Sequence, residues 1–203
     1  MAQDTAYKQN PLLKQRGVQI DFTKEQVQEV IKCARDPEYF LSEYIKVISL
    51  DDGIIPFHPY PFQQKLIDSF HNNRFTICKL PRQSGKSVTV TAYLIHQAIF
   101  RDNINIAILA NKRETSFELM AKLQTSYENL PKWLQQGVLA WNKVLLSLKM
   151  VAVLQLPQHQ VPLFGVSPTT LLCWTNLHSC PLILLMNSSA PFILPYPQVN
   201  PQK

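Results

Sequence analysis

The last 60 residues of this sequence carry almost no charge. None of the 14 acidic residues lies after Glu128, and the only basic residues after position 143 are Lys149 and Lys203. Eight of the fifteen prolines fall in the same stretch. Because soluble domains are usually about 25% charged, residues 144–203 do not have the composition of an ordinary domain surface.

The sequence also lacks the signals of secretion and of membrane insertion. Its N-terminus, MAQDTAYKQN, has no apolar core of a signal peptide. Residues 166–194 are uncharged, but proline, asparagine and histidine interrupt every apolar run before the roughly 18 residues that a membrane span needs. No C-x-x-C pair occurs among the four cysteines, which are Cys33, Cys78, Cys173 and Cys180. We therefore expect a reducing cytoplasm and no membrane partner.

The N-terminal part of the chain predicts an arm followed by helices. We expect the arm over residues 1–22 and a helical segment over residues 23–50. Within that segment, Thr23–Gln26 has the pattern of a capping box, which starts a helix to about Arg35. Asp36-Pro37 fits the start of a second helix that continues to Ile48.

Residues 51–143 have the regular alternation of an α/β domain. After a loop at 51–62, amphipathic segments alternate with short apolar runs. The expected helices are 62–72, 85–100 and 112–129, and the expected strands are 75–79 and 104–110. This order predicts a parallel sheet that helices cover on both faces.

A candidate phosphate-binding loop lies between the first of these strands and the helix after it. The sequence is KLPRQSGKS, from Lys79 to Ser87. A triphosphate needs converging backbone N–H groups, which such a turn and the start of a helix provide. Gly85 lets the backbone approach the phosphates, Lys86 reaches the β- and γ-phosphates, and the Ser87 hydroxyl ligates Mg²⁺.

This loop departs from the usual pattern G-x-x-x-x-G-K-[ST] at its first position. Leu80 stands there in place of glycine. A plain surface turn before a helix is therefore an alternative, but the flanking strand, the flanking helix and Arg82 favour a phosphate loop.

The loop resembles the deviant Walker A motif of terminase large subunits from T4-like tailed phages. In that family R-Q-x-G-K-[ST] replaces the glycine-led loop, and this chain has RQSGKS at 82–87. Two further segments, DPEYF at 36–40 and FHPYPFQ at 57–63, stand where the family has a helical N-terminal segment and an adenine-recognition motif. The resemblance covers about residues 10–143.

The resemblance implies a P-loop NTPase fold behind a helical segment, with ATP and Mg²⁺ as cofactors. The nucleotide would be bound by Gln63, Gln83, Ser84, Gly85, Lys86 and Ser87. Of these, Gln63 would read the adenine edge, because an amide both donates and accepts hydrogen bonds. Tyr60 or Phe62 would pack on the base, although each alone is more simply a core aromatic.

Arg82 would act as an arginine finger supplied by the same chain, neutralising charge on the γ-phosphate. The alternative is an ordinary surface arginine. In the complete family the ATPase packages double-stranded DNA into procapsids, with the portal protein and the small terminase subunit as partners. The expected location is the cytoplasm of the infected bacterium.

A hydrolysing P-loop ATPase also needs a Walker B strand, which ends in an aspartate for the metal and is followed by a glutamate for water. This chain has neither acid in that region. The codons behind residues 144–203 offer a reason. Trp174 is encoded only by TGG, and the codon of Thr175 begins with AC. In a frame shifted by one base, the last G of the Trp174 codon and this AC form GAC, which encodes Asp. In the same way, the last G of the Met186 codon and the AA of the Asn187 codon form GAA, which encodes Glu.

Neighbouring codons permit L-D-E-F-A-F-V-P in that frame, which is similar to a Walker B strand of the family. We therefore expect residues 144–203 to be an out-of-frame tail, disordered or non-native, behind a partial ATPase domain at 51–143. Hydrolysis of ATP is then expected to be absent, and the nuclease domain of the family is missing. The alternatives are a genuine proline-rich tail, a helicase-like P-loop ATPase, and an inert or misfolded fragment that at most binds nucleotide.

Overall fold

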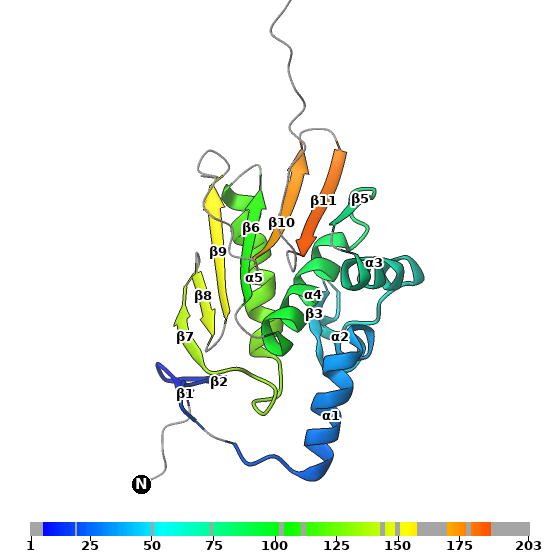
Figure 1. Cartoon of the computed structure of the whole chain (residues 1–203). Helices are drawn as coiled ribbons and strands as arrows, with labels where there is room; N and C mark the ends of the chain where they lie inside the picture. Colours follow the sequence, from blue (N-terminus) through cyan, green and yellow to red (C-terminus); the bar gives the residue numbers. More distant parts are fainter. Residues whose placement is uncertain are drawn as a thin grey trace, which may run out of the picture.

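The computed structural model describes most of residues 6–157 and two strands beyond them. The described ranges are 6–18, 20–49, 51–73, 75–101, 104–110, 113–142, 145–148, 151–157, 170–177 and 180–187. Its helices are α1 (Lys24–Arg35), α2 (Pro37–Tyr44), α3 (Pro61–Asn72), α4 (Lys86–Phe100) and α5 (Arg113–Glu128) (Figure 1). Its strands are β1 (Ala6–Tyr7), β2 (Asn10–Lys14), β3 (Lys46–Ser49), β4 (Gly53–Pro56), β5 (Phe75–Lys79), β6 (Ile104–Ala110), β7 (Val138–Trp141), β8 (Leu145–Leu148), β9 (Val151–Pro157), β10 (Thr170–Leu177) and β11 (Cys180–Asn187).

The main sheet has seven strands in the order β5-β11-β10-β6-β9-β8-β7. Strand β6 pairs in parallel with β10 and with β9, whereas the other neighbours are antiparallel. The expected α/β architecture is present, but the sheet is mixed rather than parallel. The connections 149–150 and 178–179 are each two residues long, which is too short for the crossover that parallel neighbours require.

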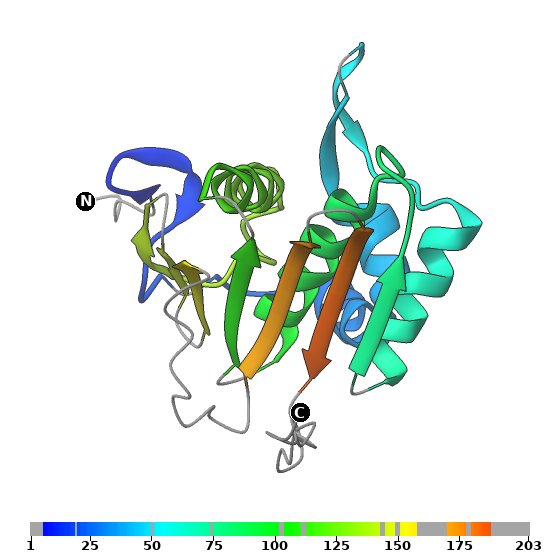
Figure 2. The same ribbon diagram turned by 90° about the horizontal axis from the view of Figure 1, so that it is seen from above.

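Strands β5, β6 and β10 run in the same direction, so their carboxyl ends lie at one edge of the sheet. Strand β11 lies between β5 and β10 and is antiparallel to both (Figure 2). In the register, Thr175 pairs with Ile183, which pairs with Cys78 of β5, and Thr175 also pairs with Ala110 of β6. Position 175 is therefore level with the end of β5, where the candidate phosphate loop begins.

Helix α4 is the most buried helix among the described residues, with every residue from Thr89 to Ile99 buried. It packs against α2, α3, α5 and β6, and Figure 2 shows α3 and α4 on one side of β5, β10 and β11. Side chains alternate along a strand, and Thr76 and Cys78 face these helices. The other face of β5 carries Phe75 and Ile77, which are 46% and 67% exposed, so the prediction that helices cover both faces is wrong at this strand.

The helical N-terminal segment is anchored on α4. The expected capping box is confirmed, since Thr23 Oγ1 accepts a hydrogen bond from Gln26 N–H and Gln26 Oε1 accepts one from Thr23 N–H. Asp36 caps α2, with Pro37 at its first position. Buried Phe40 of α2 then packs edge-on against His96 of α4.

The second helix of this segment is shorter than the sequence predicts. It ends at Tyr44, and Lys46–Ser49 forms β3 instead. Gly53, at φ +73°, follows the turn into β4, so the expected loop at 51–62 contains a strand. The β-branched residues on both sides of the turn explain the hairpin, because Val47 pairs with Ile55 and Ile48 with Ile54.

The expected arm forms a short antiparallel hairpin, β1–β2, that packs on the rest of the chain. Leu13 is fully buried. Gln135, which is 3% exposed, accepts a hydrogen bond from Lys14 N–H and donates one to the carbonyl oxygen of Leu12. These bonds fix the hairpin beside the loop that follows α5.

The tail predicted to be out of frame lies partly outside the described residues, which omit 158–169 and 188–203. Its described portions are β8, β9, β10 and β11. Their origin in a shifted reading frame stays a prediction. In the part of the chain that is described, no helix has the length and apolar character needed to cross a membrane.

Candidate phosphate-binding site

The candidate loop connects the end of β5 to the start of α4, as the sequence predicts. Two residues of this turn have left-handed backbone angles, with φ +60° at Gln83 and φ +71° at Gly85. Glycine adopts such angles without steric cost, whereas other residues do so rarely. The sharp reversal needed to bring a strand directly into a helix is therefore made at Gly85.

The N-terminus of α4 has no side-chain cap. Gly85 is its N-cap residue and contributes no side-chain hydrogen bond, and the first turn contains no acidic residue. The carbonyl oxygen of Gly85 accepts hydrogen bonds from the backbone N–H of Thr89 at 3.0 Å and from its hydroxyl at 3.2 Å. The N–H groups of the first turn are thus left to bind an anion, which the helix dipole also favours.

Lys86 points back into the loop. Its Nζ donates a hydrogen bond to the carbonyl oxygen of Pro81 at 3.2 Å, and the hydroxyl of Ser84 donates to the same oxygen at 3.0 Å. Burial lowers the pKa of Lys86, and the nearby charge of Arg82 lowers it further. A cation that is partly desolvated and held by one neutral acceptor is well suited to exchange that acceptor for a phosphate oxygen.

Arg82 itself is exposed on the tip of the loop. It lies close enough to Lys86 to affect the pKa of that ammonium group. The two cations therefore belong to one positively charged site. Whether Arg82 acts on a γ-phosphate stays a prediction.

Gln63 lies against this loop, although 21 residues separate it from Ser84. Its side chain is 3% exposed. Its Oε1 accepts a hydrogen bond from Tyr60 N–H at 2.9 Å, and its Nε2 donates to the carbonyl oxygen of Ser84 at 3.5 Å. The structure therefore brings Gln63 to the loop as expected, with its amide turned toward the loop backbone. Its predicted contact with adenine remains a prediction.

Tyr60 and Phe62 are not core aromatics, and that simpler interpretation is wrong. Their side chains are 67% and 39% exposed, and their rings stack with centroids 6.0 Å apart and an interplanar angle of 8°. Pro61 at the first position of α3 places both rings at the end of the helix that also carries Gln63. An exposed flat aromatic surface next to the candidate phosphate loop is suited to stacking on a nucleobase.

The residues fit a triphosphate better than they fit a complete magnesium site. Ser87 is half-buried in the first turn of α4 and offers one hydroxyl ligand. A carboxylate usually completes the protein's share of such a site, but position 175, at the carboxyl end of β10, is Thr. The described part of the chain holds no group of three or more His, Cys, Asp or Glu side chains arranged for a metal.

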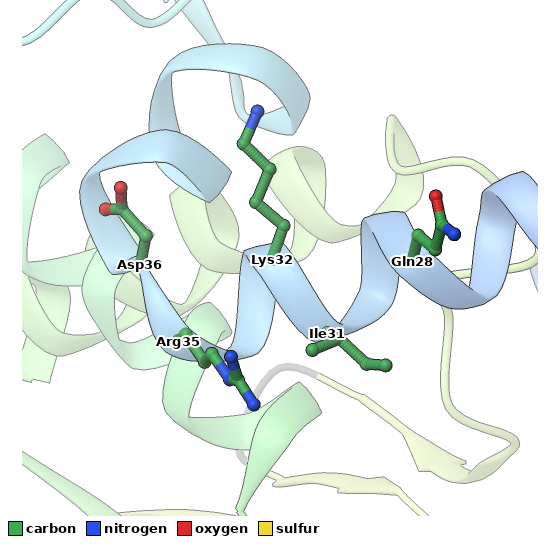
Figure 3. A pocket seen from close by; sticks show the side chains of 5 residues that line it. All are labelled: Gln28, Ile31, Lys32, Arg35 and Asp36. Atoms are coloured by element: carbon green, nitrogen blue, oxygen red, sulfur yellow. The ribbon is translucent and has the colours of Figure 1, made fainter.

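A separate shallow pocket lies on the last two turns of α1, away from the loop. It is lined by Gln28, Ile31, Lys32, Arg35 and Asp36 (Figure 3). The ammonium group of Lys32 lies 3.4 Å from the centre of the Tyr39 ring. That cation is therefore engaged by an aromatic ring of the same chain.

No protein-family model matches the chain. The identification of this site therefore depends on the positions of its residues. The sequence predicted the loop and the position of Gln63 beside it, but not the exposure of Tyr60 and Phe62 or the Pro81 carbonyl oxygen that accepts hydrogen bonds from Lys86 and Ser84. No local signal marks this carbonyl, since every residue has a backbone oxygen and only the folded turn aims this one inward.

Proposed function

We propose that this chain is the ATP-binding part of a terminase large subunit of a T4-like tailed phage, with a P-loop NTPase fold. The observation that carries the proposal is the loop at 82–87. It connects a strand to an uncapped helix, and the ammonium group of Lys86 is turned inward toward the place where phosphates would lie. The sequence RQSGKS at these positions resembles the family's Walker A motif.

In this proposal the triphosphate binds to the backbone N–H groups from Gln83 to Ser87 and to Lys86. Arg82 approaches the γ-phosphate from the tip of the loop, and the stacked Tyr60 and Phe62 pack against the base. Mg²⁺ is held by Ser87 and the phosphates alone. Lys86 gives up its hydrogen bond to the Pro81 carbonyl oxygen and binds phosphate oxygens instead. This charged contact is the contribution of Lys86 to the free energy of binding.

Hydrolysis is not part of the function that we propose for this polypeptide. No aspartate or glutamate follows Glu128, so no carboxylate is available after β10 to hold the metal or to orient water. In the complete gene product the ATPase would drive double-stranded DNA into procapsids, together with the portal and the small terminase subunit. Its place of action would be the cytoplasm of the infected bacterium.

The proposal is tested by equilibrium binding of a fluorescent ATP analogue to the purified chain. We expect Lys86→Ala to weaken binding by at least tenfold, because the charged contact to the phosphates is lost. Lys122→Ala, at an exposed position of α5, is the control and should leave binding unchanged. Equal affinities of the two variants, or no binding by the unaltered chain, would refute the proposal and favour an inert fragment.

A further inference from the structure

Both polar atoms of the Gln63 amide make a hydrogen bond within the chain. Gln63 is the third residue of α3 and caps that helix, since its Oε1 accepts the N–H of Tyr60. Its Nε2 donates to the carbonyl oxygen of Ser84. The amide keeps one further N–H and one further lone pair, but a side chain that is 3% exposed gives a ligand little access to them.

Gly85 and the Gln63 amide fit against one another. A Cβ built on Gly85 would lie 2.6 Å from Nε2 of Gln63, which is closer than non-bonded atoms approach. The amide therefore fills the space in which any other residue at position 85 would place its side chain. The same glycine supplies the left-handed turn at the N-cap of α4, so Gln63 contacts the loop at its point of reversal.

We infer that Gln63 is a positioning residue of the phosphate loop, which acts on the triphosphate rather than on the base. By holding Ser84 and Gly85 in place, it fixes the direction of the first N–H groups of α4 and the path of Lys86. A loop with a fixed backbone loses less conformational entropy when the phosphates bind. This inference depends on the proposed nucleotide-binding function.

The test compares Gln63→Met with Gln26→Met in the purified chain. Methionine has nearly the length of glutamine and no hydrogen-bonding amide. Gln26 is the matched control, because it occupies the same capping-box position in α1 and makes the same bond to its N-cap residue. Both variants lose a helix cap, but only Gln63→Met loses the contact with the loop.

Three probes separate phosphate positioning from base recognition: inorganic triphosphate, ATP and GTP, each with Mg²⁺. We expect Gln63→Met to weaken all three by a similar factor of about ten, as the loss of one well-placed interaction would. Gln26→Met should leave all three unchanged. A loss confined to ATP, with inorganic triphosphate unaffected, would overturn the inference and support adenine reading.

Two further measurements keep the inference testable. If Gln63→Met shows no cooperative thermal transition, Gln63→Asn replaces it, because its shorter side chain keeps the amide but cannot reach Ser84. In addition, Gly85→Ala should weaken triphosphate binding less in a Gln63→Ala background than in the unaltered chain, since the clash is then relieved. Additive effects would count against positioning. If the unaltered chain binds none of the probes, the proposed function itself is wrong.

Discussion

His96 and Cys33 are joined by a hydrogen bond of 2.9 Å between the imidazole Nε2 and the backbone carbonyl oxygen, across 63 residues of sequence. The second ring nitrogen, Nδ1, lies 3.2 Å from Nε2 of Gln97. The imidazole is 2% exposed. One buried side chain thus links α4, the helix after the candidate phosphate loop, to the end of α1.

This link predicts that acid destabilises the fold. Burial lowers the pKa of His96 to about 4, more strongly than the bond to Cys33 raises it; His71 and Arg101 lower it further, and Asp36 raises it. In the unfolded chain the imidazole protonates near pH 6.5. As the pH falls below that value, the unfolded state binds the proton first, so stability decreases until about pH 4.

We expect the free energy of unfolding to be about 2 kcal/mol lower at pH 5 than at pH 7 because of His96. Urea titrations at both values measure it. His96→Gln should remove most of this difference, whereas His58→Gln, at an exposed position, should retain it. An equal difference in the two variants would show that other groups cause the acid sensitivity.

Gln135 predicts a second strong effect on stability. Its Nε2 donates to the carbonyl oxygens of Leu12 and Leu130, and its Oε1 accepts from Lys14 N–H. We expect Gln135→Met to destabilise the chain by about 3 kcal/mol, because buried backbone groups lose their partners. Gln124→Met, which removes a single exposed bond to Asn142, should cost less than about 1 kcal/mol. Similar urea midpoints for both variants would contradict this.

The chain should not turn over ATP. The carboxyl end of β10, level with the phosphate loop, has no acid to hold the metal or to activate water. In a steady-state assay we expect phosphate release equal to that of Lys86→Ala. Turnover that is present in the unaltered chain and lost in Lys86→Ala would show that other groups complete the site.

The encoding DNA provides an independent check on the tail. Restoring one base near codon 144 should give an open frame in which positions 174–177 read L-D-E-F or a close variant. The longer product should hydrolyse ATP, because it regains both acids. A frame that stops soon after the added base, or that lacks these acids, would show that residues 144–203 are a genuine tail.

The sequence was sufficient for the elements whose signals are local. The capping box at Thr23, the Asp36-Pro37 start and the strand–loop–helix around Gly85 depend on neighbouring residues, and all are where they were expected. The hairpin β3–β4 was missed because Ile45 and Ile48 also fit a helical period. Only the pairing of Val47 with Ile55 and of Ile48 with Ile54 decides for a strand.

The direction and order of the strands in the mixed sheet could not be predicted from local sequence patterns either. The direction of β11 depends on the two-residue connection to β10, and its place beside β5 depends on pairing over about a hundred residues. Exposure was equally hidden. Tyr60 and Phe62 are residue types that usually lie in a core. Their rings are exposed here because of where the start of α3 lies in the fold.

Helix α4 begins at the candidate phosphate loop and carries His96 in its last two turns. Ten residues of helical rise place Lys86 and His96 roughly 15 Å apart. Because the helix is enclosed from Thr89 to Ile99, it cannot bend between them without disturbing the core. If the proposed triphosphate binding moved the first turn of α4, the helices α1 and α2 would feel it, because α4 contacts them through the bond of His96 to Cys33 and the packing of His96 on Phe40.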